Sequence, residues 1–158
     1  MNEATVRKAT IDDSDALGAL ERSWPLELQV SPPSGAFFTG RLPEDVLVAE
    51  RDGRIIGMAH LAPHSSMAVN AHVLHLNAIV VDPAIRSGGV GGLLVESAIA
   101  EARSRGKRKL GLRVLGHNHR AIRLYERHGF SLEGRLREEF LMADGRYADD
   151  LWYALDLT

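Results

Sequence analysis

A glycine-rich segment, Val81-Asp82-Pro83-Ala84-Ile85-Arg86-Ser87-Gly88-Gly89-Val90-Gly91-Gly92, joins an apolar run to a helical pattern. Four glycines among its last five residues let a ligand approach the backbone closely. The first turn of the following helix carries N–H groups without intrahelical partners and the positive end of the helix dipole. Arg86 adds a fork-shaped cation just before the glycines. The segment therefore predicts an anion site suited to a pyrophosphate, although a turn without a ligand gives the same pattern.

The glycine spacing excludes two common nucleotide-binding loops. A Walker loop needs Gly-Lys-Ser or Gly-Lys-Thr, and neither tripeptide occurs in the chain. The dinucleotide fingerprint Gly-x-Gly-x-x-Gly follows the first strand of a βαβ unit, and the spacing here is different.

The patterns on either side of the segment predict an α/β domain with a mixed sheet, spanning residues 1–158. Asp52-Gly53 and Asp144-Gly145 are hairpin turn signals, and Gly134 is expected to mark a bulge. The consecutive apolar residues Ile79-Val80-Val81 indicate burial on both faces. We expect strands over residues 5–10, 46–50, 54–61, 71–81, 109–115, 130–142 and 148–157. Helices are expected from Asp12 or Asp13, as N-cap, to Trp24, over 88–105 and over 118–128.

Composition narrows the class of protein further. The 158 residues include no cysteine, which excludes disulfides, thiolate metal sites and a cysteine nucleophile. The formal net charge of -2 gives no reason to expect nucleic acid or an anionic membrane as a partner. The first residues lack the apolar core of a secretory signal, and no apolar run is long enough to cross a bilayer. We therefore expect a cytoplasmic protein.

A second motif, Asn118-His119-Arg120-Ala121-Ile122-Arg123-Leu124-Tyr125-Glu126-Arg127-His128-Gly129-Phe130, lies on the third predicted helix. Asn118 and Tyr125 are seven residues apart, so they share one helix face about 10.5 Å apart along the axis. An asparagine offers a donor and an acceptor to an extended, amide-rich ligand, but it is also a common N-cap. A tyrosine in this position also fits a core aromatic.

The two motifs together resemble the GCN5-related N-acetyltransferase (GNAT) superfamily. Arg86, Gly89, Gly91 and Gly92 fit its Arg-x-x-Gly-x-Gly signature, preceded by a Val-Asp-Pro strand end. Asn-x-x-Ala-Ile-x-Leu-Tyr-Glu-x-x-Gly-Phe looks like the family's segment after the fifth strand. The resemblance covers nearly the whole chain, because the expected order of elements is also the family's order. It implies a mixed, mostly antiparallel central sheet of about seven strands flanked by helices.

The resemblance also implies acetyl-CoA as acyl donor, without a metal. In the family, backbone amides of the glycine loop hold the pyrophosphate, and the preceding strand pairs with the pantetheine arm. It implies that Asn118 contacts that arm and that Tyr125 is the general acid toward the thioester sulfur. Arg120 and Arg123 are candidates for contact with the 3′-phosphate. The expected coenzyme-binding residues are Ile79, Val80, Val81, Arg86, Ser87, Gly88, Gly89, Val90, Gly91, Gly92, Asn118 and Arg123.

The general base is open at this point. Many family members place a glutamate near the middle of the long strand, where this chain has Asn77, which cannot act as a base. His75 lies two residues earlier, on the same strand face, and is the candidate proton acceptor, directly or through water. The alternative is a strand histidine packed at the sheet surface without a catalytic role. A metal site built from His60, His64, His72 and His75 has no supporting motif spacing.

The acceptor pocket is expected between the early loop and the last hairpin. Candidates are Trp24, Leu26, Gln29, Phe37, Phe38, and the hairpin residues 134–138 and 144–149. Leu28-Gln29-Val30 before Pro32-Pro33 resembles members that acetylate free amino acids, and the hairpin also resembles those acting on protein N-termini. We expect transfer to a primary amine of a small molecule, such as an amino acid, by direct attack in a ternary complex. The alternatives are a protein N-terminal acetyltransferase, a non-catalytic acetyl-CoA sensor, and an interaction domain without a ligand. A homodimer through the sheet edge or the last hairpin is compatible with the sequence.

Overall fold

The computed structural model describes residues 2–25, 35–85 and 88–158. Its strands form one seven-stranded sheet in the order β1-β2-β3-β4-β5-β7-β6. Neighbouring strands run antiparallel, except β4 and β5, which are parallel. This confirms the α/β class and the mixed, mostly antiparallel sheet. The strands are β1 (Thr5–Lys8), β2 (Val46–Arg51), β3 (Arg54–Pro63), β4 (Val73–Val81), β5 (Lys109–Leu115), β6 (Ser131–Leu141) and β7 (Tyr147–Asp156).

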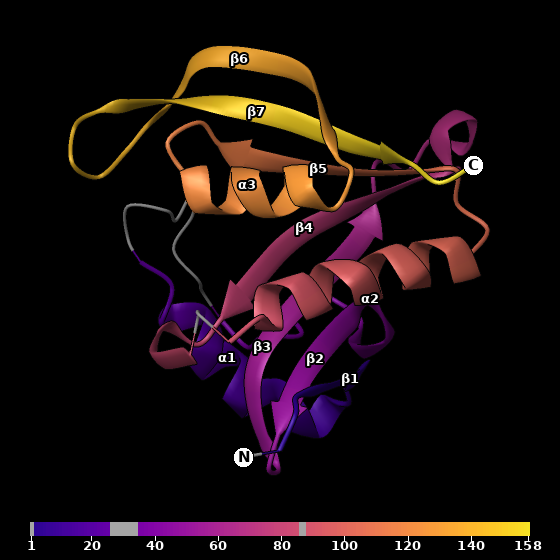
Figure 1. Cartoon of the computed structure of the whole chain (residues 1–158), viewed down its shortest axis with the longest axis vertical. Coiled ribbons are helices and arrows are strands. Elements are labelled where there is room, and N and C mark those ends of the chain that lie inside the picture. Colours follow the sequence, from indigo (N-terminus) through magenta and orange to yellow (C-terminus); the bar gives the residue numbers. More distant parts are fainter. Residues whose placement is uncertain (1, 26–34, 86–87) are drawn as a thin grey trace.

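Helices cover both faces of this sheet (Figure 1). The longer ones are α1 (Ser14–Arg22), α2 (Val90–Ser104) and α3 (His119–Arg127), and short 3-10 turns are η1 (Ile11–Asp13), η3 (Pro43–Asp45), η4 (Ala68–Asn70) and η5 (Pro83–Ile85). Alternate residues of β2 show the two layers. Leu47 and Ala49 belong to the core with α2 and α3, whereas Val46 and Val48 belong to the core with α1. None of the helices in the described ranges is long and apolar enough to span a membrane.

The start of α1 differs from the prediction. Asp13 stands at the N-cap, but its side chain makes no capping hydrogen bond. Its carboxylate instead accepts hydrogen bonds from Arg7 Nη1 and from the Thr10 N–H, each at 2.8 Å. Because the arginine competes for the same oxygen atoms, Asp13 ties β1 to the turn before α1 rather than capping the helix.

The pairing of β4 with β5 stops halfway along β4. The two strands pair from Val73–Lys109 to Leu76–Leu112, and beyond that point they diverge (Figure 1). The backbone of residues 77–81 therefore has no β5 partner on that side. Backbone N–H and C=O groups need hydrogen-bonding partners, so this edge can accept an extended ligand.

A bulge at Asn77 coincides with the divergence. On the β3 side, His60 pairs with Ala78 and Leu61 with Leu76, which leaves Asn77 unpaired. An extra residue reverses the alternation of faces. Accordingly, Leu74 and Leu76 belong to the core under α2 and α3, and beyond the bulge it is the odd-numbered Ile79 and Val81 that do so. Ala78 and Val80 pack toward α1, which confirms the predicted burial on both faces.

Close packing sets the position of α2 beside this opening. A Cβ on Gly57 of β3 would lie 3.0 Å from Leu94 Cδ1, 3.1 Å from Val90 Cγ1 and 3.2 Å from the Val80 carbonyl oxygen. Only a glycine leaves room for the helix at this distance. The N-terminus of α2 is thereby held next to the unpaired part of β4.

Candidate active site

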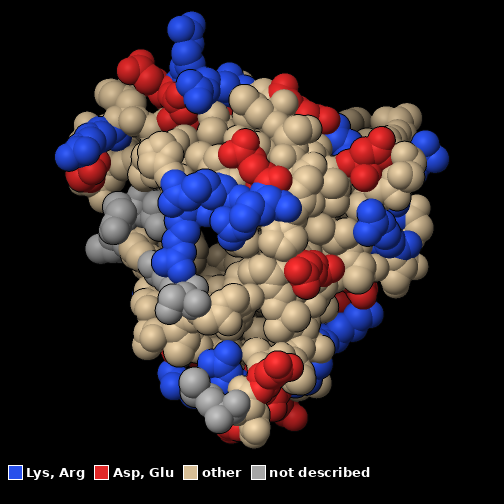
Figure 2. Space-filling view, in the orientation of Figure 1, with Lys and Arg blue, Asp and Glu red and all other residues tan. Residues whose placement is uncertain are grey.

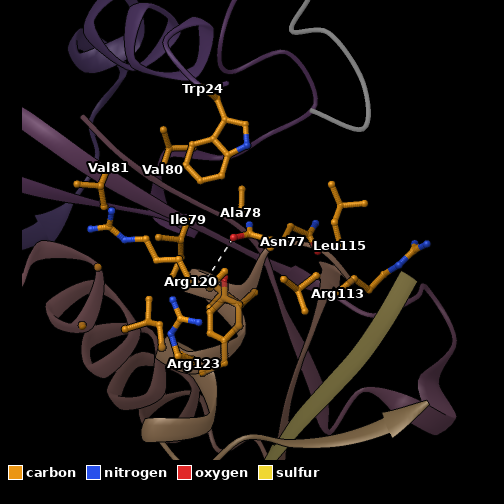
Figure 3. Close-up of a pocket in the computed structure, with 18 of the residues that line it drawn as sticks. Trp24, Asn77, Ala78, Ile79, Val80, Val81, Arg113, Leu115, Arg120 and Arg123 are labelled. Carbon is orange, nitrogen blue, oxygen red and sulfur yellow. Dashed lines mark hydrogen bonds between the residues drawn. The ribbon is translucent and has the colours of Figure 1, made fainter. Parts of the chain in front are cut away.

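A cleft of about 970 Å³ occupies the wedge between β4 and β5. At one end it is bordered by the N-terminus of α2 and by α3, and at the other by Trp24, Phe140 and Asp150. Figure 3 shows Trp24 on one side of the wedge and the α3 residues Arg120 and Arg123 on another. The lining includes residues that face each of the two cores, so the cleft connects the two faces of the sheet. Two ligands entering from different faces can meet in it.

The end of the cleft at α2 combines features that favour a negatively charged ligand. Gly89, at the N-cap of α2, has a φ of 77°, a conformation that favours glycine. A Cβ on Gly91 would lie 3.3 Å from Leu124 Cδ2, so small residues let α2 start close against α3. Arg120, Arg123 and Arg127 of α3 also line the cleft. Figure 2 shows Lys and Arg side chains gathered over α3 at the edge of a hollow. The helix N-terminus and these cations favour the same negative ligand.

The predicted coenzyme-binding residues are largely brought together here. Ile79, Val80, Val81, Gly89, Gly91, Gly92, Asn118 and Arg123 all line the cleft. Arg86 and Ser87 lie outside the described residues. The Val90 side chain is 1% exposed and packs in the core, so only its backbone can face a ligand. Gly88 is exposed just before the helix.

Asn118 has the capping role that its position allows. Its Oδ1 accepts a hydrogen bond from the Ala121 N–H at 3.3 Å, which caps α3. That bond uses the oxygen and leaves the Nδ2 donors for another partner. Because Asn118 also lines the cleft, the cap and a ligand contact are compatible.

Tyr125, two turns further along α3, is both a core aromatic and a cleft residue. It is 8% exposed, and its ring centroid lies 5.9 Å from that of Phe130. Burial raises the pKa of the Tyr125 phenol to about 12. The phenol therefore keeps its proton at neutral pH and presents a donor in the cleft.

His75 lines the cleft as half of a histidine pair. Its Nε2 lies 2.9 Å from Nδ1 of the exposed His64, so the pair leads from the cleft to the protein surface. Burial, followed by the nearby His64, Arg113 and Lys109, lowers the pKa of His75 to about 4. The imidazole is thus neutral at pH 7. No group of three or more metal-ligating side chains is found in residues 2–25, 35–85 and 88–158.

The acceptor end differs in part from the expected pocket. Trp24 lines the cleft, but Phe37 is 4% exposed in the core under α1 and Phe38 packs against that core. The prediction that Phe37 lines the pocket is therefore wrong, because its ring is buried in the core formed by α1 and β2. Leu26 and Gln29 lie outside the described residues.

The last hairpin contributes Phe140 and Asp150. The expected bulge at Gly134 is confirmed by a register shift between Leu132 and Gly134. A second shift falls between Leu136 and Phe140, where Glu138 has a φ of 50° and donates its N–H to Asp149 Oδ1 at 2.9 Å. Bulges re-aim the side chains that follow them, and Phe140 comes to lie 5.9 Å from Arg113 Cζ.

Sequence reasoning missed one pair at this end. Arg113 of β5 and Asp150 of β7 are 37 residues apart, and Arg113 Nε donates to Asp150 Oδ2 at 2.9 Å. No local motif marks either residue. Their approach depends on the register of β5 against β7, in which Leu115 pairs with Asp150 and Arg113 with Trp152.

Comparison with known proteins agrees with this architecture. The sequence profile of the acetyltransferase (GNAT) family matches residues 14–130. The uncharacterised N-acetyltransferase YhfO of Bacillus subtilis is 32% identical over 131 residues, covering 79% of this chain and 88% of that protein.

Solved structures that share the fold include two determined with acetyl-CoA. YncA from Salmonella typhimurium, determined with its cofactor acetyl-CoA, superposes with a TM-score of 0.86 at 21% identity, covering 99% of this chain and 95% of its own. A GNAT superfamily phosphinothricin acetyltransferase from Sinorhizobium meliloti, in complex with acetyl-CoA, superposes with a TM-score of 0.82 at 19% identity. The match covers 97% of this chain and 88% of that chain. The chain therefore belongs to the acetyltransferase (GNAT) family and is an N-acetyltransferase.

Proposed function

We propose that this enzyme transfers the acetyl group to a primary amine of a small molecule, by direct attack within a ternary complex. The observation that carries the proposal is the cleft that connects the two sheet faces, with an anion-binding end and an aromatic end. Acetyl-CoA, which is bound in the structures of YncA and of the Sinorhizobium meliloti enzyme, would supply the acetyl group as an activated thioester. Because the chain has no cysteine, a cysteine acyl-enzyme is excluded, which supports direct attack.

The residues of the first end fit the coenzyme. The open N–H groups at the start of α2, where glycines 89, 91 and 92 keep the backbone accessible, would hold the pyrophosphate, and Arg123 would add charge. The edge of residues 77–81 that has no β5 partner would pair with the amides of the pantetheine arm. Asn118 Nδ2 would donate to the same arm.

At the other end, Trp24 and Phe140 provide apolar walls. Because aromatic side chains enclose this end of the cleft, its shape favours a small-molecule acceptor rather than a folded protein. The deciding experiment measures release of free thiol from acetyl-CoA with amino acids, polyamines, aminoglycosides and peptides with free N-termini. We expect release with a small amine. Release with peptides alone would assign a protein N-terminal acetyltransferase, and coenzyme binding without release for any amine would assign a sensor.

Tyr125 is proposed to donate a hydrogen bond toward the departing sulfur. Full proton transfer from a phenol of pKa about 12 to a thiolate whose acid has a pKa of about 8.5 is uphill by roughly 5 kcal/mol. A hydrogen bond from the protonated phenol avoids that cost while stabilising the developing charge.

Tyr125→Phe is expected to lower kcat by roughly 10- to 100-fold, with the KM for acetyl-CoA changed less than about threefold. The matched control is Tyr153→Phe, since Tyr153 is buried in the same core and does not line the cleft. Equal kcat values for wild type and Tyr125→Phe would refute the assignment.

The two roles of Asn118 can be separated by substitution. Serine retains an N-cap oxygen and loses the amide donors, whereas alanine loses both. Asn118→Ser is expected to raise the KM for acetyl-CoA several-fold with little change in stability to urea. Asn118→Ala is expected to lose about 1 kcal/mol of stability as well. A KM that changes only in Asn118→Ala would mean that the side chain acts as a cap and nothing more.

His75 is proposed as the acceptor of the amine proton, with His64 as the outward path. With a pKa of about 4, His75 is unprotonated throughout pH 5.5–9 and can accept a proton. In a plot of kcat/KM against pH, the only rise should then come from deprotonation of the acceptor ammonium. The plot should show no inflection between pH 6 and 7.

We expect His75→Gln to lower kcat/KM roughly 10- to 100-fold at every pH without changing the shape of that profile. The exposed His72 provides the control, as His72→Gln. Full activity in His75→Gln would remove His75 from the mechanism.

A further inference from the structure

Arg113 stands at the apex of the wedge. Leu76–Leu112 is the last pair that joins β4 to β5, so Arg113 is the first β5 residue beyond it. Leu112 and Val114 face the core with α2 and α3, which directs Arg113 to the other face of the sheet. Figure 3 places it on the opposite side of the cleft from Arg120 and Arg123. An anion bound by Arg113 would therefore be distinct from the one bound at α2.

The guanidinium of Arg113 is fixed from three directions. Its Nε and Nη2 both donate to Asp150 Oδ2, and the same oxygen accepts from Trp152 Nε1 at 3.1 Å. Its Cζ lies 4.8 Å from the Trp152 ring centroid and 5.9 Å from that of Phe140. A planar cation held in this way is preorganised for a ligand.

The two members of the pair differ in accessibility. The Asp150 side chain is 2% exposed, whereas that of Arg113 is 46% exposed. Asp150 lines the cleft but is nearly buried, so the arginine is the accessible member of the pair. A guanidinium has five N–H groups, and Asp150 accepts from the one on Nε and from one of the two on Nη2. The second N–H of Nη2 and both N–H groups of Nη1 make no hydrogen bond to another described residue.

The free edge of the guanidinium matches one kind of ligand. Two parallel N–H groups, one on Nη1 and one on Nη2, fit the two oxygens of a carboxylate. Among the described residues, no second carboxylate is paired with Arg113. We propose that Arg113 binds a carboxylate of the acceptor, so that the preferred substrates are small amines with a carboxylate close to the amine, such as amino acids. The inference rests on the proposed transfer to a small amine and names its substrate class.

The test compares each of the twenty L-amino acids with its C-terminal amide in the thiol-release assay. Wild type is expected to favour the free acid over the amide by at least tenfold in kcat/KM for its best amino acid. Equal rates with acids and amides would overturn the inference and leave the small-amine proposal standing. Thiol release with none of the amines would refute both.

Variants then assign the preference to Arg113. Removing the arginine alone leaves a buried carboxylate unpaired, so the main variant is the neutral pair Arg113→Gln with Asp150→Asn. It should raise the KM for the acid at least tenfold while changing the KM for the amide and for acetyl-CoA less than threefold. Arg113→Lys keeps the charge beside Asp150 but lacks the fork, and it should show an intermediate loss. Equal losses with acid and amide in both variants would mean a structural role only.

Discussion

The divergence of β4 from β5 after Leu76–Leu112 is the constraint on which the site depends. A parallel pair that stops halfway leaves backbone hydrogen-bonding groups along the rest of β4 facing an opening. The bulge at Asn77 adds a second consequence, because it reverses which side chains face each layer. One strand therefore borders both ends of the cleft, the end proposed to bind the coenzyme and the end proposed to bind the acceptor.

Positive charge is placed at two separate positions around this opening. The start of α2 and the arginines of α3 form one of them, where glycine packing lets the two helices approach closely. Arg113 forms the other, where Asp150 and two aromatic rings hold the guanidinium in place. Because the nearly buried Asp150 balances the charge of Arg113, the apex keeps directional donors without a large local excess of charge.

Burial acts in opposite directions on the two proposed proton-handling groups. It raises the pKa of Tyr125 and lowers that of His75, so both side chains are neutral at physiological pH. A neutral phenol suits hydrogen-bond donation, and a neutral imidazole can accept a proton although it is a weak base. Asn77 in the middle of β4 cannot act as a base. The two carboxylates that line the described part of the cleft are both engaged by arginines, Asp150 by Arg113 and Glu21 by Arg41.

The sequence by itself determined the elements, the glycine turn before α2 and the shared face of Asn118 and Tyr125, because periods of 2 and 3.6 residues and turn signals are local properties. It left open whether Asn118 was a cap or a ligand contact. Only the tertiary structure decided where β4 leaves β5, that Phe37 enters the core, and that Arg113 meets Asp150. These features, like the pKa of His75, arise from strand register and burial, and register joins residues that no local pattern connects.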